Sequence, residues 1–130
     1  IAILNGDEGP VFDRVVDVRL RSGRLFVSSV TVFELWFGVA KSAPSRQAAN
    51  GRRLQDFTKD RSITFISWTN DDAAAAARIR DQLRRLGRPI GPYDTLIAGQ
   101  AMARGLTVVT ANTGEFARIP GLPVEDWSAA

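Results

Sequence analysis

The chain has 130 residues, of which 45% are hydrophobic and 24% are charged, and its 17 basic and 14 acidic side chains give a formal net charge of +3. It contains no histidine and no cysteine, which excludes a Ser-His-Asp triad, a thiol nucleophile, disulfides and a zinc site of thiolates and imidazoles. The length fits a single domain over residues 1–130; no stretch reads as a membrane span or a signal peptide, and we expect a cytoplasmic location.

Apolar residues in the first half of the chain alternate between helical and extended spacing, which predicts an α/β fold. The expected elements are a helix over 11–21 begun by Pro10 and ended by Gly23, a strand over 25–28, a helix through Glu34 to about residue 40, a polar helix over about 46–58 and a strand over 63–66. Ser29 or Thr31 is expected to cap the second of these helices.

The second half shows clear helix signals at both ends of its elements. The run Asn70-Asp71-Asp72 supplies a cap and negative charge for a helix over 73–86, which Gly87 stops. The remaining elements are a helix over about 93–104 stopped by Gly105, a β-branched strand over 107–110, and a turn with a short final strand within 120–127. Strands separated by helices predict a parallel sheet with right-handed crossovers.

Three carboxylates stand in separate motif-like stretches: Glu34 in SSVTVFELWFGVAKS, Asp94 in RPIGPYDTLIAGQAMARG and Glu115 in LTVVTANTGEF. Open parallel sheets gather ligands at the carboxyl ends of their strands. Glu34 and Glu115 each follow a predicted strand, and Asp94 begins a helix that can point into the same crevice. Capping alone also explains Asp94, and Glu115 is equally an ordinary first-turn acid. Oxygen ligands of this kind suit Mg²⁺ or Mn²⁺.

Arginine is concentrated on the predicted helices, where basic faces can hold a phosphate backbone, although such side chains are usually just solvated. The arginines concerned are Arg46, Arg52, Arg53, Arg78, Arg80, Arg84, Arg85, Arg88 and Arg104.

Taken together, the three stretches resemble the PIN domain of the VapC toxin family, the ribonuclease half of bacterial toxin–antitoxin pairs. The similarity covers most of residues 25–127 in the family's order. It implies a three-layer α/β/α fold with a mainly parallel twisted sheet. It also implies an Mg²⁺-dependent endoribonuclease in which Glu34, Asp94 and Glu115 bind the metal, with Thr110 and Asn112 shaping the site. Clustered acids without their cation are expected to have raised pKa values.

The resemblance also implies partners, namely a VapB-type antitoxin, an RNA substrate such as tRNA, and a second copy in a homodimer. An antitoxin tail would lie along a groove and reach the acids with a basic side chain. Phe33, Trp36 and Phe37, beside Glu34, could receive that tail, with core packing favoured for at least two of the three. Trp36, Phe37 and Arg88 are the candidate groove residues.

The chain departs from the family pattern at its beginning. Family members start with a strand that ends in Asp-Thr-Asn, whereas this sequence starts Ile-Ala-Ile-Leu-Asn-Gly. We therefore expect the first strand and its aspartate to be missing and the domain to be N-terminally incomplete. Reading residues 1–4 as that strand is the alternative, and it leaves no acid in place.

Two other functions fit parts of the pattern. One is a PIN-like domain that has lost hydrolysis and only binds RNA or a partner protein. The other is a flavodoxin-like phosphoacceptor, which is disfavoured because no paired acids follow a first strand and no lysine ends a late strand.

Overall fold

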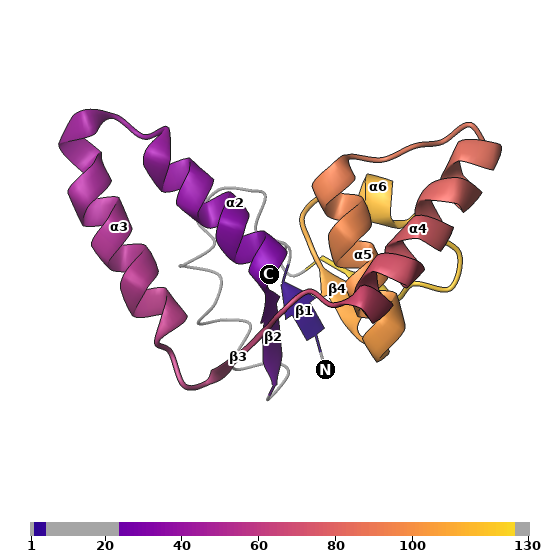
Figure 1. The fold of residues 1–130 in the computed structure, drawn as a ribbon, viewed down its shortest axis with the longest axis horizontal. Helices are drawn as coiled ribbons and strands as arrows, with labels where there is room; N and C mark the ends of the chain where they lie inside the picture. The colour runs from indigo at the N-terminus through magenta and orange to yellow at the C-terminus, as the bar shows by residue number, and fades with distance from the viewer. Residues whose placement is uncertain (1, 5–23, 127–130) are drawn as a thin grey trace.

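The computed structural model describes residues 2–4 and 24–126, which form strands and helices of a mixed α/β fold (Figure 1). The elements are β1 (Ala2–Leu4), β2 (Leu25–Ser28), α2 (Ser29–Ala40), α3 (Pro44–Thr58), β3 (Ile63–Ile66), α4 (Asn70–Arg85), α5 (Pro92–Arg104), β4 (Thr107–Val109), α6 (Thr113–Phe116) and β5 (Val124–Glu125). The helix expected over 11–21 lies outside the described residues. No helix in the described part of the chain is long and apolar enough to cross a membrane.

The five strands form one parallel sheet in the order β3-β2-β1-β4-β5. From β1 the chain adds β2 and then β3 on one side of the sheet. The connection after β3 then crosses to the other side of β1, where β4 and β5 are added. The strand order therefore reverses at β1, which places the ends of β2 and β4 on either side of the centre. This is the kind of switch point at which open α/β sheets bind ligands.

The expectation that the first strand is missing is wrong for this structure. Ala2–Leu4 occupies the centre of the sheet and pairs on one side with β2, through Ala2↔Leu25, and on the other with β4, through Ile3↔Val108. A parallel sheet with an empty centre would leave two rows of buried backbone groups unpaired, which is costly. The short apolar run at the start of the chain fills that place, as the alternative reading allowed.

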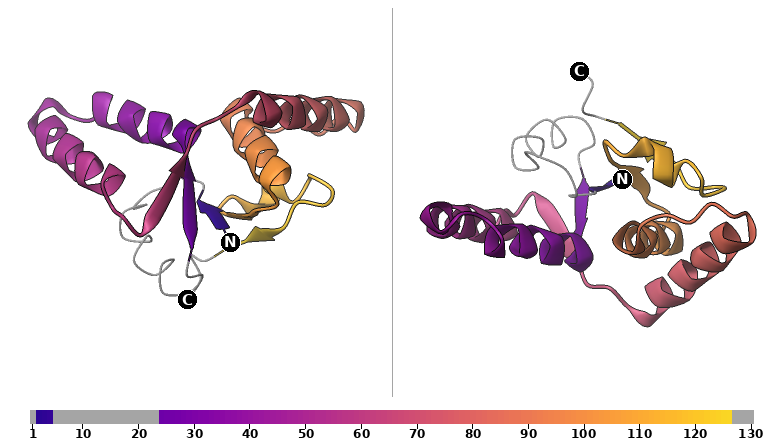
Figure 2. Two further views of the ribbon diagram at one scale, coloured as in Figure 1. Left: turned by 60° about the horizontal axis from the view of Figure 1, so that its bottom comes forward. Right: turned by 90° about the horizontal axis from the view of Figure 1, so that it is seen from above.

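The helices cover both faces of the sheet, giving the predicted three-layer arrangement (Figure 2). Alternate residues of β2 explain why, since Leu25 and Val27 pack in a cluster with Leu54 and Phe57 of α3, whereas Phe26 packs against the cluster formed by α4 and α5. Successive side chains of a strand point to opposite faces. The view from above accordingly shows α2 and α3 on one side of the strands and α4 and α5 on the other.

The helix starts differ in detail from the sequence predictions. Ser28, not Ser29 or Thr31, caps α2 by accepting a hydrogen bond from the Val30 N–H at 3.1 Å. Thr69 caps α4 in a capping box with Asp72, whose carboxylate accepts from the Thr69 N–H at 2.8 Å. Both shifts are of one or a few residues, because several adjacent side chains can serve as caps and only the local backbone decides which does.

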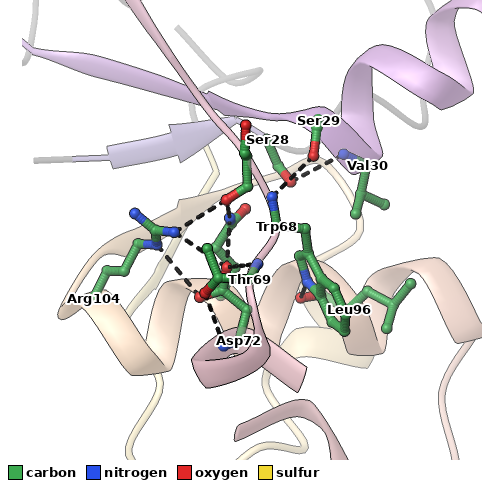
Figure 3. A network of polar contacts seen from close by, with 10 residues as sticks. Ser28, Ser29, Val30, Trp68, Thr69, Asp72, Leu96 and Arg104 are labelled. Atoms are coloured by element: carbon green, nitrogen blue, oxygen red, sulfur yellow. Dashed lines mark hydrogen bonds and ion pairs between the residues drawn. The ribbon is translucent and has the colours of Figure 1, made fainter. Parts of the chain in front are cut away.

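Asp72 is the centre of a polar network that ties α4 to α5 (Figure 3). Its carboxylate, 1% exposed, accepts hydrogen bonds from Gln100 at 2.9 Å and from Arg104 at 3.2 Å. Burial raises the pKa of Asp72, but the hydrogen bonds from Arg104, the Thr69 N–H and Gln100 outweigh burial and lower it. A buried carboxylate with this many donors holds the two helices in one relative position.

Trp68, which follows β3, connects α2 with α5. Its backbone N–H donates to the Ser29 hydroxyl at 3.1 Å, and its indole N–H donates to the Leu96 carbonyl at 3.2 Å. Figure 3 shows the residue between the start of α2 and the side of α5. The start of α2 and the first half of α5 are thereby joined through one residue, by its backbone on one side and its indole on the other.

Candidate active site

Asp94 lies in the first turn of α5 and is 6% exposed. Local sequence places it there, because Pro92 stands at the first helical position and Gly91 before it takes the extended conformation that a residue preceding proline prefers. Thr95 secures the turn, since its hydroxyl and its N–H both donate to the Gly91 carbonyl, at 2.9 and 3.0 Å. The carboxyl group is thus held at a buried helix start.

Glu115 comes to the same place from the other side, on the short helix α6 that follows β4. Its carboxyl group lies close enough to that of Asp94 to share a hydrogen bond when one of the two carries a proton. Between them lies Asn112, whose Nδ2 donates to Glu115 Oε2 at 3.1 Å and to Asp94 Oδ2 at 3.4 Å. We call Asp94 and Glu115 the acid pair; residues 21 positions apart meet here because β4 and α5 are neighbours in the fold.

Thr110, directly after β4, fixes the position of Asn112. Its side chain is buried, at 1% exposure, and its hydroxyl oxygen accepts the Asn112 backbone N–H at 2.9 Å. The bond folds the chain sharply just after β4, as short hydroxyl side chains do in turns. Thr110 therefore shapes the position of Asn112 beside the acid pair.

The electrostatics of Glu115 differ from the prediction. The hydrogen bond from Asp94 lowers the pKa of Glu115; burial opposes this, while the Gly91 N–H, the Asn112 amide and the nearby Arg118 lower it further. The expectation of raised carboxylate pKa values is therefore wrong for Glu115. A nearby acid raises the pKa of a carboxyl group only where other groups do not stabilise its charged form. Here Gly91, Asn112 and Arg118 each stabilise the charged form of Glu115.

Arg118 has a second role beside the acid pair. Its guanidinium Nη1 donates to the Pro89 carbonyl at 2.9 Å, which ties the segment after α6 to the loop between α4 and α5. The same loop carries Gly91. Sequence reasoning missed both Gly91 and Arg118; a glycine directly before a helix-starting Pro-Tyr-Asp was the only available signal for the first.

Glu34, the third predicted acid, lies in the second turn of α2 and is half-buried. One residue before it, Phe33 packs against Tyr93 with ring centroids 5.6 Å apart, so this part of α2 faces the beginning of α5. Among the described residues, however, no three acidic side chains lie close enough together to hold one metal ion. The structure brings Asp94 and Glu115 together, and the metal-binding roles of all three acids stay predictions.

The aromatic residues next to Glu34 are on the surface. Phe33 is 53%, Trp36 39% and Phe37 58% exposed, so the expectation that at least two of them pack in the core is wrong. They alternate with core-facing Val32, Leu35 and Val39 along α2 because that helix buries only one stripe against α3 and the sheet. Lys41 lies over the Phe37 ring at 5.2 Å.

The arginines divide into two groups. Arg84 and Arg85 both pair with Asp81, at 2.7 and 2.9 Å, and Arg104 pairs with buried Asp72. The other predicted basic residues lie on exposed helix surfaces or, for Arg88, in the exposed loop before Gly91; they are Arg46, Arg52, Arg53, Arg78, Arg80 and Arg88. The basic surface is thus narrower than the sequence count suggested.

Comparison with known proteins agrees with this fold and these motifs. The family model for the PIN domain matches residues 1–122. The solved structure of DNA-bound VapBC from Salmonella typhimurium has a chain that superposes with a TM-score of 0.81 at 32% sequence identity, over 97% of both chains. A chain of VapBC2 from Rickettsia felis, bound to a promoter DNA fragment, gives the same TM-score at 27% identity, over 97% of this chain and 98% of that one.

Curated relatives narrow the class further. A tRNA(fMet)-specific endonuclease VapC from Shigella flexneri is 45% identical over 113 residues, which is 84% of this chain and 80% of the relative. Its namesake from Salmonella typhimurium is 42% identical over 109 residues, 83% of this chain and 79% of the relative. The chain belongs to the PIN domain family and, within it, to the VapC ribonucleases.

Proposed function

We propose that the chain is the toxin of a bacterial toxin–antitoxin pair, a Mg²⁺-dependent endoribonuclease that hydrolyses RNA phosphodiester bonds at the acid pair. The observation that carries the proposal is the meeting of Asp94 and Glu115 around the Asn112 amide, beside the strand ends at the sheet's switch point. A relative with 45% identity carries the name of a tRNA endonuclease, which supports the same activity.

The donors at the acid pair fit a hard divalent cation. Two carboxylates converge, and the positive end of the Asn112 amide already lies within 3.4 Å of both, where it supplies partial positive charge to the pair. A side-chain amide can also present its oxygen after a flip, so Asn112 can act as donor to the acids or as an oxygen ligand. Oxygen donors without nitrogen or sulfur favour Mg²⁺, and Mn²⁺ as its substitute.

When bound, Mg²⁺ lowers the pKa of a coordinated water and neutralises charge on the phosphate oxygens. Asp94 and Glu115 would hold the ion, and the predicted third ligand is Glu34 from α2. Thr95 and the Gly91 carbonyl hold the turn that aims Asp94. Arg118 offsets negative charge at Glu115 and keeps the neighbouring loop in place. No histidine is needed in this chemistry.

RNA would approach over the exposed arginines. Arg88 stands in the loop that leads to Gly91, and Arg78 and Arg80 lie on α4, which precedes that loop. Such side chains bind phosphates without reading base sequence. By similarity to the tRNA(fMet)-specific relatives we propose transfer RNA as the first substrate to test, and with it a cytoplasmic location.

The proposed protein partner is a VapB-type antitoxin. The structural neighbours are VapBC complexes, and the exposed aromatic residues Phe33, Trp36 and Phe37 of α2 offer an apolar strip beside the start of α5. A bound antitoxin segment would bury this strip and cover the route to the acid pair. We also propose that the toxin acts as a homodimer, as the family resemblance implies.

Cleavage of purified initiator tRNA and of total cellular RNA tests the activity. We expect cutting with Mg²⁺, none with EDTA, and a loss of at least about a hundredfold in Asp94→Asn, since such a change removes a charged ligand while keeping its shape. Asp56→Asn, on the exposed face of α3, is the matched control and should cut like the unchanged chain.

The competing function is an inactive PIN-like domain that only binds RNA or a partner. It would be favoured if the chain folds and binds RNA but cuts none of it in Mg²⁺ or Mn²⁺. Cleavage that survives EDTA or the Asp94 change would contradict the metal-dependent mechanism instead.

A further inference from the structure

Gly91 occupies the position closest to the acid pair on the loop between α4 and α5, and its backbone does not require a glycine. Its φ of −58° and ψ of 150° are ordinary for any L-residue and favoured before proline. Its N–H donates to Glu115 and its carbonyl accepts from Thr95. Every residue has this carbonyl, and every residue except proline has this N–H. Something other than conformation therefore accounts for the missing side chain.

The space beside Gly91 shows what a side chain would meet. A Cβ at this position would lie 3.8 Å from Glu115 Oε2 and 3.9 Å from Asp94 Oδ2, and apart from its chain neighbours no other described atom would lie within 4 Å. The neighbouring loop residues Ile90 and Pro92 line an apolar hollow of about 590 Å³ together with Trp68 and Ala76. A side chain at residue 91 would therefore border one carboxylate oxygen of each acid.

A cation held by the acid pair needs that space. Mg²⁺ binds oxygen at about 2.0–2.1 Å, so its other ligands, waters or a phosphate oxygen, lie within about 4 Å of the carboxylate oxygens. A methyl group at 3.8 and 3.9 Å from the two oxygens would take up volume within that range of both carboxyl groups. Without a metal the same methyl makes only ordinary van der Waals contact and should not disturb the fold.

We propose that Gly91 is a positioning residue that keeps one side of the Asp94–Glu115 pair open for the ligands of a bound divalent cation. The inference rests on the proposed function. It predicts that side chains at residue 91 weaken metal binding in proportion to their size while leaving the metal-free protein intact.

The test is Mn²⁺ titration of the purified chain, followed by the electron paramagnetic resonance signal of free Mn²⁺, for Gly91→Ala and Gly91→Val. We expect the Mn²⁺ dissociation constant to rise on the order of tenfold for Ala, the lower end of what outer-shell changes cost, and further for Val. RNA cleavage should fall in the same order. The midpoint of thermal unfolding in EDTA should stay that of the unchanged chain.

Gly51→Ala is the matched control. Its Cβ would also meet one neighbour at 3.8 Å, but that neighbour is the apolar Val39 Cγ1 on α2, far from any acid in the pair. This variant should bind Mn²⁺ like the unchanged chain.

Three other results would contradict the inference, and one of them would also contradict the proposed function. Unchanged Mn²⁺ binding in both Gly91 variants would overturn the inference while leaving the ribonuclease proposal standing. A lowered unfolding midpoint in EDTA for Gly91→Ala would also overturn it, because the backbone would then need glycine. If the unchanged chain neither binds Mn²⁺ nor cuts RNA, the proposed function fails and this inference fails with it.

Discussion

Replacing Gly99 with alanine should destabilise the protein even though alanine is the better helix former. Gly99 lies in the middle of α5, where α5 crosses α4. A Cβ built there would lie 2.5 Å from the Ala76 Cβ and 2.6 Å from both its Cα and its N. Two of these three atoms are backbone, so no rotation of a flexible side chain can relieve the contact.

The magnitude follows from two opposing effects. Ordinary carbon–carbon contacts are about 3.5–4.0 Å, so the helices must separate by roughly 1 Å or more. Overpacking of this kind costs typically about 1–3 kcal/mol, and the Asp72 network that joins the same two helices resists the movement. Alanine returns about 1 kcal/mol of helix propensity. Because the contacts with Ala76 are so short, the cost lies in the upper half of that range, and subtracting the propensity gain leaves a net loss of about 1–2 kcal/mol in the free energy of unfolding.

The measurement is urea unfolding at neutral pH, with Gly51→Ala in the interior of α3 as the companion variant. That change makes only one ordinary contact, with Val39, and should stabilise the protein by about 0.5–1 kcal/mol. The reasoning is refuted if Gly99→Ala is as stable as the unchanged chain, or if both alanine variants shift stability in the same direction.

Two further changes test the contacts that place α4, α5 and α2. Because the pKa of Asp72 is lowered in the folded protein, the stability that its carboxylate contributes is complete above the unfolded pKa of about 3.9 and is lost as the pH falls through the lower folded pKa. Urea unfolding between pH 7 and pH 2.5 should therefore show a steeper loss of stability toward acid for the unchanged chain than for Asp72→Asn. Parallel curves for the two proteins would contradict this. Trp68→Phe removes the indole bond to the Leu96 carbonyl and should cost about 1 kcal/mol in the same unfolding assay, whereas no loss would show that this bond adds nothing.

Most elements were predictable because their signals are local. The strands over 25–28 and 63–66 were predicted with the observed bounds, and Gly105 ends α5 in the left-handed conformation that a glycine stop implies. Helix starts moved by a few residues, since neighbouring serine, threonine, asparagine and aspartate residues compete as caps. The surface position of Phe33, Trp36 and Phe37 could not be read from α2 alone, because hydrophobicity does not show which face of a helix is covered.

The two acids of the candidate site were singled out from the sequence, but the way the site assembles around them was not. Glu115 was chosen from its place after a predicted strand and Asp94 from its place at the start of a predicted helix, and the fold brings them together. The lowered pKa of Glu115 depends on donors from Gly91, Asn112 and Arg118, which approach it only in the folded chain. Arg104 counted as a free basic residue in the sequence, yet the structure commits it to Asp72.

The sequence by itself determined the order of most strands and helices, the absence of imidazole and thiol chemistry, and the choice of Asp94 and Glu115 as candidate acids. These follow from residue type, apolar periodicity and the residues that begin or end helices, all of which are local. Only the tertiary structure decided that Ala2–Leu4 lies at the centre of the sheet, that α4 and α5 touch at Gly99, and that Gly91 borders the acid pair. These are contacts between segments distant along the chain, and they arise from the packing of whole elements, which no local pattern encodes.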